Sequence, residues 1–582
     1  MTLLNNVIYY GLHLHLHILI LFFFAILSLV WFWLTTKRSS TVPPLPPGPR
    51  GWPIVGYLPF LSPNLHIDLS ELAKVYGPIF RLWMGTKLYV VITSPQLVGE
   101  VVSQQDKVFA NRDVSISAFI YTHGGNNVAF APYGPKWKNY RKIMVQEMSS
   151  TTVLSNLYCF RKEEVRKSVR WLFKNVNTPI DIGRLAYQIS MNNVMRMTIG
   201  ATLEGDDVVS RDIDQFKKMT EDLMMLVAKL RRLVGRNENI GIGMGMGMRI
   251  GMEWNKIATK QRNGMKIISF PFHSISLPPT KRHLNVSDIF PALKWFDLQG
   301  IERDTRKIHR AFEVMIENAM AKRKKVMSNP LAVKSSRKDF LQFLMELCEN
   351  QNTEEAPITT SEIKGLLMDL FVGGTDTTIS TVEWAMAEML KNPSVLIKVQ
   401  EELKQIVGLN NNVEESHLTK LTYLNNVFKE TLRLHPPAPF LLPRSPTQST
   451  IVGGYTIPKG STIFLNVWSI HRDPSIWENP LEFKPERFDE SGASGNNYNF
   501  LGNNLNYFPF GSGRRICAGI SLVERMVMLI LASFLHYFDW KLPSGTKIEL
   551  SDKFGLVVNK KNPLKAIPTP RLSNVDLYTT ML

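Results

Sequence analysis

The chain has 582 residues, 44% of them hydrophobic, so it is long enough to bury a large core. Its three cysteines, Cys159, Cys348 and Cys517, exclude a disulfide-stapled scaffold and favour a reducing compartment. The formal net charge is +18, but the basic residues are scattered and no nucleic-acid-binding motif accompanies them. A membrane surface and an acidic protein partner therefore explain this charge better than nucleic acid does.

A nearly unbroken apolar run from Ile18 to Leu34 stands close to the N-terminus. With the residues just before it, the run is about long enough to span a bilayer. Tryptophans near its end and Lys37 and Arg38 after it predict that this end faces the cytoplasm. A cleaved signal peptide is the alternative, but its charged start and small-residue cleavage site are not evident. We expect a membrane anchor over residues 1–36, a proline-rich hinge over 37–50 and a catalytic domain over 51–582.

The stretch 233–283 does not resemble the rest of the catalytic domain. Glycine fills nearly every second position from Gly241 to Gly251, which opposes both helix and packed strand. Between Gly235 and His283, eight Lys or Arg stand against two Glu, a net charge of +6. We expect an insertion without a catalytic role, arising either from a retained intron or gene-model error or as a disordered, membrane-facing segment.

A long helical pattern over residues 361–391 contains an unusual polar run, Gly373-Gly374-Thr375-Asp376-Thr377-Thr378. Paired glycines and successive hydroxyl side chains are poor helix formers, so the run predicts a kink or a widened turn. A carboxylate beside a hydroxyl can relay protons into a site that is otherwise closed to water. A polar kink without chemistry is the alternative.

Two shorter spacings place charged and aromatic side chains together. Trp137 and Arg141 are four residues apart and share a helix face, and Glu430 and Arg433, three residues apart, do so as well. Taken alone, the first pair can be a surface cation packed on an aromatic ring. The second can be a solvated salt bridge.

The most informative stretch is the loop Phe510-Gly511-Ser512-Gly513-Arg514-Arg515-Ile516-Cys517-Ala518-Gly519, which precedes a helical run over 520–536. Backbone N–H groups and the start of the following helix favour negative charge on the Cys517 sulfur. The glycines bring backbone amides close to that sulfur, where such donors tune a bound metal. Arg515 can pair with an anionic group. A buried structural cysteine is the alternative.

This loop resembles the motif Phe-x-x-Gly-x-Arg-x-Cys-x-Gly of the cytochrome P-450 family at Phe510, Gly513, Arg515, Cys517 and Gly519. The resemblance extends from Pro43 to the C-terminus, except for the insertion. It implies a mainly α fold with small β-sheets, preceded by one transmembrane helix. It also implies heme b, with Cys517 as the axial ligand of the iron. The implied reaction is monooxygenation, in which one atom of O2 enters a C–H bond and the other leaves as water.

The resemblance assigns further roles. It implies that Asp376 delivers protons and that Thr377 forms hydrogen bonds to the oxygen ligand. The residues expected to contact the heme are Trp137, Arg141, Arg444, Arg515, Phe510, Gly513 and Gly519. Glu430, Arg433 and Arg487 are expected to form a buried triad. We expect the triad to be structural rather than catalytic, because removing one member of a buried charge network leaves an unpaired ion.

The expected substrate pocket is apolar. Its residues are Phe119, Ile120, Met368, Phe371, Gly373, Gly374, Phe440, Leu441, Phe554 and Leu556. Several of these can equally be plain core residues. The amino-acid sequence resembles plant microsomal members of the family, most closely sesquiterpene oxygenases of the delta-cadinene hydroxylase type. A small lipophilic terpene is therefore the expected substrate, and the alternative is a flavonoid or phenolic substrate, since flat rings also suit phenylalanine-lined pockets.

Two further classes stay open. One is a heme enzyme that rearranges peroxides without dioxygen, which the Asp376–Thr377 pair disfavours. The other is a non-catalytic heme-binding pseudoenzyme, which the insertion makes plausible. NADPH-dependent activity would separate both from a monooxygenase.

The resemblance also implies partners and location. Electrons are expected from NADPH through a cytochrome P-450 reductase, with cytochrome b5 as a second candidate partner and no nucleic acid. Lys138, Lys142 and Arg514 are candidate cations for the reductase encounter, which predicts salt-sensitive turnover; ordinary solvated charges are the alternative. The protein is expected to be a single-pass endoplasmic reticulum membrane protein with its catalytic domain in the cytosol.

Overall fold

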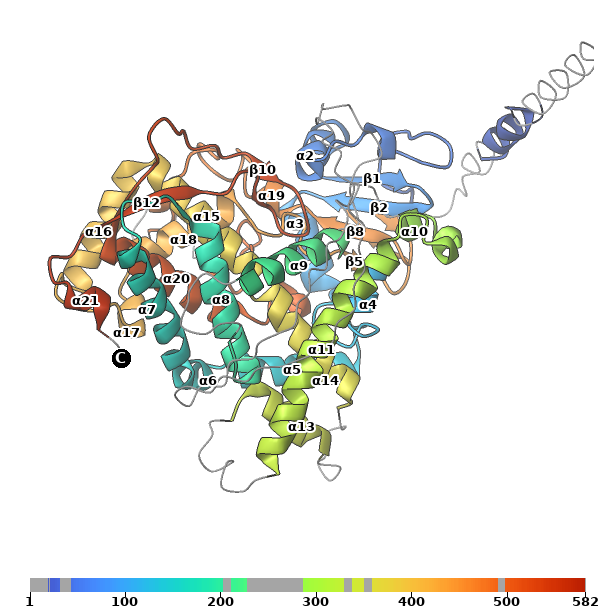
Figure 1. Ribbon diagram of the computed structural model, residues 1–582. Coiled ribbons are helices and arrows are strands. Elements are labelled where there is room, and N and C mark those ends of the chain that lie inside the picture. The colour runs from blue at the N-terminus through green and yellow to red at the C-terminus, as the bar shows by residue number, and fades with distance from the viewer. Residues whose placement is uncertain are drawn as a thin grey trace, which may run out of the picture.

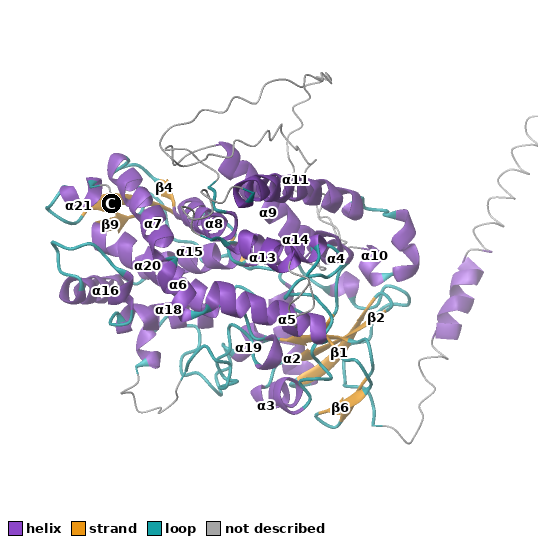
Figure 2. Ribbon diagram, turned by 90° about the horizontal axis from the view of Figure 1, so that it is seen from below, coloured by secondary structure: helices purple, strands orange, loops and turns teal. Residues whose placement is uncertain are grey.

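The computed structural model describes residues 19, 21–31, 43–202, 211–227, 286–328, 338–349, 358–489 and 498–580. The expected insertion over 233–283 lies outside the described residues. The described residues form a mainly helical body with small β-sheets, as the resemblance implies (Figure 1, Figure 2). The largest sheet lies at one end of this body, and helices make up the remainder (Figure 1).

The largest sheet has five strands in the order β1-β2-β8-β5-β3. β1 (Ile79–Met84) and β2 (Lys87–Ile92) form an antiparallel pair, and β2 continues in parallel register with β8 (Thr462–Leu465). The pair turns at Gly85, whose φ of +59° suits glycine. β2 lies inside the sheet and is rich in Val and Ile, and its five residues from Leu88 to Ile92 are buried.

The other strands are short. They are β3 (Asn111–Arg112), β4 (Ile180–Asp181), β5 (Arg444–Ser445), β6 (Thr450–Val452), β7 (Tyr455–Ile457), β9 (Phe538–Lys541), β10 (Asp552–Lys553), β11 (Asn559–Lys560) and β12 (Lys565–Pro570). β4, β12 and β9 form a three-stranded sheet, while β6 with β7 and β10 with β11 form two-stranded ones.

The helical core is built around α15 (Asp376–Lys391), which packs against α8 (Ile182–Ile199), α18 (Thr422–Leu434) and α20 (Ile520–Tyr537). Every residue of α8 except Arg184 is buried. Such a helix, covered on all sides, belongs at the centre of a large body. The loop with Cys517 leads directly into α20, so the core holds that loop at its C-terminal end.

The remaining helices surround this core. They are α2 (Leu65–Tyr76), α3 (Pro95–Gly99), α4 (Ile116–Tyr121), α5 (Pro135–Met144), α6 (Thr151–Asn156), α7 (Tyr158–Lys174), α9 (Arg211–Val227), α10 (Val286–Ile289), α11 (Ile301–Met327), α13 (Phe340–Glu349), α14 (Thr360–Met368), α16 (Pro393–Ile406), α17 (Glu415–Leu418), α19 (Val467–Ile470) and α21 (Asp576–Thr579). Short 3-10 or π turns are η1 (Leu58–Phe60), η2 (Glu100–Gln104), η3 (Val145–Ser149), η4 (Pro291–Phe296), η5 (Asp369–Gly373), η6 (Pro485–Phe488) and η7 (Gly513–Arg515).

Among the described residues, one helix is long and apolar enough to cross a membrane, namely α20. It is 78% buried inside the body and is therefore a core helix. The N-terminal apolar run appears as a shorter helix over Leu21–Trp31.

The polar run at Gly373–Thr378 interrupts a long helix, as its composition predicts. α14 ends at Met368, the π turn η5 follows, and α15 begins at Asp376. The freed carbonyl groups accept hydrogen bonds from hydroxyl side chains: Thr375 Oγ1 donates to Phe371 (2.7 Å) and Thr377 Oγ1 to Gly373 (2.9 Å). These side chains thus stabilise the widened turn.

Candidate active site

The cysteine loop is closed by its own backbone. Cys517 N donates to the carbonyl oxygen of Phe510 (3.0 Å), and Gly519 N donates to Cys517 Sγ (3.3 Å). Gly513 has a φ of +69°, and a Cβ there would lie 2.4 Å from the carbonyl oxygen of Val102, so both conformation and space require glycine. The sulfur is thereby presented at a fixed point with one backbone donor directed at it.

The Cys517 side chain is exposed, although the surrounding protein raises the pKa of its thiol. The sulfur is therefore accessible rather than packed against neighbours, although much of the protein surrounds it. The Gly519 N–H and the Arg141 charge both lower that pKa in opposition to burial. They favour the thiolate form, which is the form that ligates a metal.

Four arginines gather beside this loop, and we call Arg112, Arg141, Arg444 and Arg515 the arginine cluster. Burial lowers the pKa of all four guanidinium groups. Repulsion among the arginines lowers the pKa of Arg112 and Arg515 further, and Arg515 falls to about 9.

The cluster is held mainly by neutral carbonyl groups. Arg515 donates to the carbonyl oxygens of Ala110, Val128 and Ala131, Arg112 to those of Ala129 and Leu442, Arg141 to that of Ile516 and Arg444 to that of Ser512. Within the described part of the chain, the carboxylate that forms an ion pair with the cluster is Asp106, at 3.4 Å from Arg444. Asp106 is shared with Arg514. The cluster thus carries more positive charge than its protein partners neutralise.

Trp137 lies inside the cluster. Its Nε1 donates to the carbonyl oxygen of Val128 (3.0 Å), and the Arg515 guanidinium lies over its ring at 4.4 Å. Arg141, one helical turn later in α5, lies 5.8 Å from the same ring. The pairing expected from the four-residue spacing is present, and Arg515 joins it from the cysteine loop. Arg112 was not predicted, because a lone arginine on a two-residue strand carries no pattern.

A second buried charge group lies behind the loop, and we call Glu430, Arg433 and Arg487 the charge triad. Glu430 Oε2 lies 2.6 Å from Arg433 Nε, and Glu430 Oε1 lies 3.1 Å from Arg487 Nε. Glu430 and Arg433 have fully buried side chains. Arg433 also donates to the carbonyl oxygens of His471 and Pro480, both at 2.7 Å. The triad therefore ties α18 to the segment that precedes the loop.

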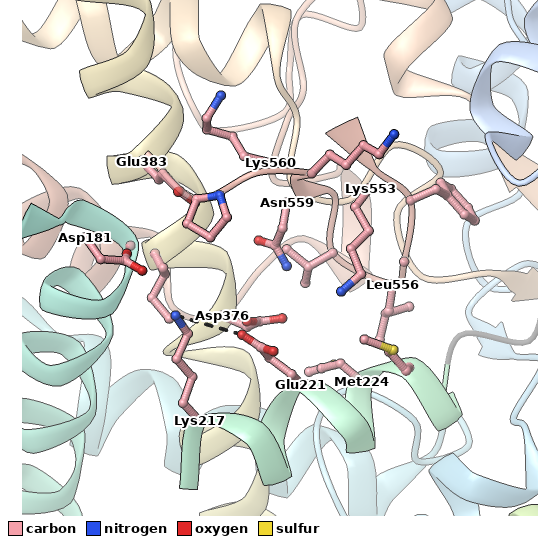
Figure 3. A pocket seen from close by; sticks show the side chains of 18 residues that line it. Asp181, Lys217, Glu221, Met224, Asp376, Glu383, Lys553, Leu556, Asn559 and Lys560 are labelled. Atoms are coloured by element: carbon pink, nitrogen blue, oxygen red, sulfur yellow. Dashed lines mark ion pairs between the residues drawn. The ribbon is translucent and has the colours of Figure 1, made fainter. Parts of the chain in front are cut away.

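Asp376 lies at the start of α15 and lines a cavity of about 160 Å³ between α9, α15 and the β10–β11 hairpin (Figure 3). Its carboxyl group is 6% exposed, and burial, aided by the charge of Glu221, raises its pKa to about 6. Lys217 opposes this shift and lies 3.9 Å from Glu221. The three side chains point toward one another from two elements (Figure 3).

A second cavity, of about 60 Å³, is mainly apolar and has four phenylalanines in its wall; we call it the aromatic cavity. Of the predicted pocket residues, it contains Phe440, Leu441, Phe554 and Leu556. It also contains Phe130, Phe464, Asp113 and Ser115, which the sequence did not single out. Phe554 and Leu556 line the Asp376 cavity too, so one chain segment separates the two cavities.

The other predicted pocket residues lie elsewhere. Phe119 is 53% exposed on α4, while Ile120, Met368 and Phe371 are buried in the body. Beside Gly373, a Cβ would meet nothing within 4 Å, so this residue borders open space, whereas at Gly374 it would lie 2.7 Å from the carbonyl oxygen of Leu370. None of these six lines either of the two cavities.

Comparison with known proteins places this geometry in a family. The model of the cytochrome P-450 family matches residues 46–235 and 273–567, and the unmatched gap falls within the expected insertion. A flavonoid 3'-monooxygenase of Crocosmia x crocosmiiflora is 35% identical over 553 residues, covering 94% of this chain and 96% of the relative. A flavonoid 3'-monooxygenase of Petunia hybrida is 34% identical, covering 91% and 93%. A flavonoid 3',5'-hydroxylase of Solanum melongena is 35% identical, covering 92% of each chain.

The fold agrees with a solved structure. A zebra fish cytochrome P-450 with progesterone superposes with a TM-score of 0.66 at 22% identity, covering 88% of this chain and all of that one. Members of the family bind heme b and receive electrons from NADPH through a reductase. An accessible thiol beside an excess of buried guanidinium groups fits a heme with its two propionates. The chain belongs to the cytochrome P-450 family of monooxygenases.

Proposed function

We propose that this protein hydroxylates a flavonoid or a closely similar phenolic compound. The observation that carries the proposal is the set of flavonoid hydroxylases that match nearly the whole chain at 33–35% identity. They support the alternative substrate class considered from the sequence rather than the sesquiterpene class. Apolar side chains alone do not discriminate between the two, because both substrates are largely hydrophobic.

The aromatic cavity supports this choice. Phe440 stacks on Phe464 with ring centroids 4.9 Å apart, and Phe554 meets Phe440 edge-on at 5.9 Å. Flat ring faces of this kind favour a flat aromatic ligand over a puckered hydrocarbon. Ser115 and Asp113 add polar groups at the wall, which suit phenolic hydroxyl groups.

The heme site follows from the geometry of the loop and the arginine cluster. We assign Cys517 as the iron ligand and the four arginines, with Trp137, as the groups that hold the propionates. Phe510, Gly513 and Gly519 shape the loop. When bound, the heme supplies the activation of dioxygen. Guanidinium groups suit this role because they bind carboxylates with paired, charge-assisted hydrogen bonds.

We further propose that Asp376 and Thr377 deliver protons. Asp376 lines the cavity of about 160 Å³ between α9, α15 and the β10–β11 hairpin. Its pKa of about 6 makes both protonation states accessible near neutral pH. Thr377 is half-buried and bonded to Gly373, next to the open space beside that glycine. We assign Asp376 to carry a proton from the cavity and Thr377 to hold it at the site of reaction.

An apolar surface supports location at the endoplasmic reticulum membrane. Trp295, Phe296 and Leu298 are 91%, 69% and 63% exposed at the end of η4. The preceding α10 is bonded to the β1–β2 turn, where Thr86 Oγ1 donates to the carbonyl oxygen of Ile289 (2.7 Å). Together with the apolar N-terminal helix, this surface suits insertion into a bilayer.

The cysteine side offers a basic surface for the reductase. Lys138 and Arg514 lie over the same ring, that of Tyr133, at 5.8 and 5.6 Å. Lys142, one turn further along α5, is exposed as well. We assign these cations to the reductase encounter, and we place cytochrome b5 on the same surface.

The test is a reconstitution of the membrane-bound protein with reductase and NADPH. One reaction receives a flavanone with a single phenolic hydroxyl on its outer ring, and another receives a cyclic sesquiterpene hydrocarbon of similar size. A flavanone product heavier by one oxygen, formed only with NADPH, is the expected result. Turnover of the sesquiterpene alone would overturn the assignment, and product formation without NADPH would contradict monooxygenation itself.

A further inference from the structure

Two histidines and a glutamate converge at a place that none of the assigned functions uses. His123 follows α4, while His309 and Glu313 are one turn apart on α11, and α4 lies beside α11 (Figure 1). Glu313 Oε1 lies 3.9 Å from His123 Nδ1 and 3.7 Å from His309 Nε2. One ligand atom from each residue falls within 4.8 Å of the others.

The backbone holds His123 in an uncommon conformation. Its φ is +52°, in the left-handed region, and Gly124 and Gly125 follow with φ of +85° and +83°. Such a conformation is uncommon for a non-glycine residue and is retained where the surroundings enforce it. Asn126 Nδ2 donates to the carbonyl oxygen of His123 (2.7 Å) and helps to hold this turn. The turn directs the His123 ring to His309, with ring centroids 4.4 Å apart.

The imidazole nitrogens lack ordinary partners. His123 Nε2 and His309 Nδ1 are buried, and neither has a hydrogen-bond partner among the described residues. The nitrogens that face Glu313 are too far from it for a hydrogen bond. Buried polar atoms are nearly always bonded, so these two nitrogens are unusual, and the opposite nitrogen of each ring is the one that faces Glu313. Burial also lowers the pKa of both imidazoles.

We propose that His123, His309 and Glu313 form a binding site for a transition-metal ion, with Zn²⁺ as the best match. Two neutral imidazoles and a carboxylate are a ligand set that zinc commonly uses, with water in the fourth position. Zinc bond lengths of about 2.0–2.1 Å place tetrahedral ligand atoms roughly 3.3 Å apart. The observed separations from Glu313 need to shrink by only about half an ångström, which side-chain rotation provides.

Nearby charged side chains determine which cations compete with a metal ion for Glu313. Lys364 Nζ lies 3.6 Å from Glu313 Oε1 and 2.5 Å from Glu317 Oε1. Arg306, one turn before His309, is paired with Glu302 at 2.6 Å. Lys364 is therefore the internal cation that a metal ion displaces from Glu313, and Glu317 retains it.

A metal ion here joins two elements beside the aromatic cavity. Ser115, at the start of α4, lines that cavity, and Thr305 Oγ1 of α11 already donates to Ser117 Oγ (3.0 Å). Metal binding at His123 adds a second link at the other end of α4. We infer that the ion stabilises α4 against α11 and so restricts opening of this wall. The inference does not depend on the identity of the substrate.

The experiment uses the full-length, heme-loaded protein, first stripped of metal with a chelator. Zn²⁺ is titrated against a fluorescent zinc indicator into the wild type, H123N/H309N, E313Q and K364Q. The wild type is expected to bind one equivalent more than H123N/H309N, with two imidazole ligands visible in zinc X-ray absorption. E313Q is expected to bind at least about tenfold more weakly, since changes merely around a metal's ligands already cost about 10–100-fold. K364Q is expected to bind more tightly.

Controls separate the site from other zinc ligands and from misfolding. H417N removes a histidine elsewhere and is expected to keep the additional equivalent, while Ca²⁺, which prefers oxygen ligands, is expected not to compete. Zn²⁺ should also slow hydrogen exchange over residues 116–125 in the wild type alone. Identical zinc uptake by the wild type and H123N/H309N would overturn the proposal. If H123N/H309N loses its heme spectrum, K364Q decides: unchanged affinity overturns the site, and tighter binding supports it.

Discussion

Two groups of buried arginines lie on either side of the cysteine loop, and they differ in what neutralises them. In the charge triad, Arg433 and Arg487 both pair with the fully buried Glu430, and backbone carbonyls satisfy the remaining donors. Among the described residues, only Arg444 of the arginine cluster forms an ion pair, with Asp106; burial and mutual repulsion lower the pKa of Arg515 to about 9. The triad is complete within the protein chain, whereas the cluster requires an anion from outside it.

This difference in counter-charge implies different roles for the arginines of the triad and those of the cluster. A complete buried charge network contributes to the stability of the fold whether or not a ligand is present. An unbalanced cluster gains stability only when an anionic group binds, so its effect appears in ligand affinity. We therefore propose that the triad is structural and that the cluster is preorganised for the heme propionates. The following predictions test this contrast.

The largest effect is expected from C517A, because it removes the ligand that places the heme against the cluster. We expect loss of the thiolate-type band in the CO difference spectrum and loss of NADPH-dependent product. C159A, which removes an exposed cysteine elsewhere, is the matched control and should keep both. A thiolate-type band in C517A would show that another residue ligates the iron.

E430Q should destabilise the fold by about 3–5 kcal/mol, because it leaves Arg433 and Arg487 buried without their counter-charge. The loss should appear in the heme-loaded and heme-free proteins alike, measured by denaturant unfolding. E486Q is the control, since Glu486 pairs with the exposed Lys398, and such a pair contributes about 0–1 kcal/mol. Equal losses in the two variants would argue against a special role for the triad.

R444Q should act on heme retention rather than on the fold. Losing a charge-assisted contact to a propionate costs about 1.5–3 kcal/mol, or on the order of tenfold to a hundredfold in heme affinity. The rate of heme transfer to a scavenging protein measures this. The free energy of unfolding of the heme-free form should change little or increase, because the R444Q substitution reduces the repulsion among the arginines of the cluster. R514Q, at an exposed neighbour, should leave heme transfer unchanged, and a destabilised heme-free R444Q would erase the contrast with E430Q.

The smallest expected effect is a shift in the pH dependence of turnover when the charged neighbours of Asp376 are changed. Asp376 must be protonated to donate, so turnover limited by this step should fall as pH rises through about 6. Glu221 raises the pKa of Asp376 and Lys217 lowers it, so E221Q should move the falling limb to lower pH and K217Q to higher pH. Product formation from pH 5 to 8 provides the measurement, with D376N expected to lack the limb. Shifts of the same sign in both variants would contradict this account.

Much of the site was predictable because its spacing is local. Trp137 with Arg141 and Glu430 with Arg433 lie one helical turn apart, and the loop from Phe510 to Gly519 closes on its own backbone. The broken helix also followed from its glycines and hydroxyl side chains, because these act on the nearest carbonyl groups. Each of these features depends on residues only a few positions away.

The predicted pocket residues do not all gather in one place. Phe119 is largely exposed and Met368 and Phe371 are fully buried, whereas Phe130 and Phe464 line the aromatic cavity. An apolar residue satisfies core, surface and pocket equally in a linear pattern, and only packing decides among them. For the same reason, the apolar residues alone indicated only a lipophilic substrate; the resemblance to sesquiterpene oxygenases suggested a terpene, and the relatives support a flavonoid instead.

The sequence by itself determined the family, the loop that carries Cys517 and the interruption of the helix at Gly373–Thr378, since short motifs impose their own local geometry. The tertiary structure decided which distant residues meet. It brought Arg112 to Arg515, Glu221 to Asp376 and His123 to Glu313, pairs that no periodicity connects. Their meeting depends on how long helices and loops pack across the whole body, and that packing minimises exposed apolar surface over hundreds of residues at once.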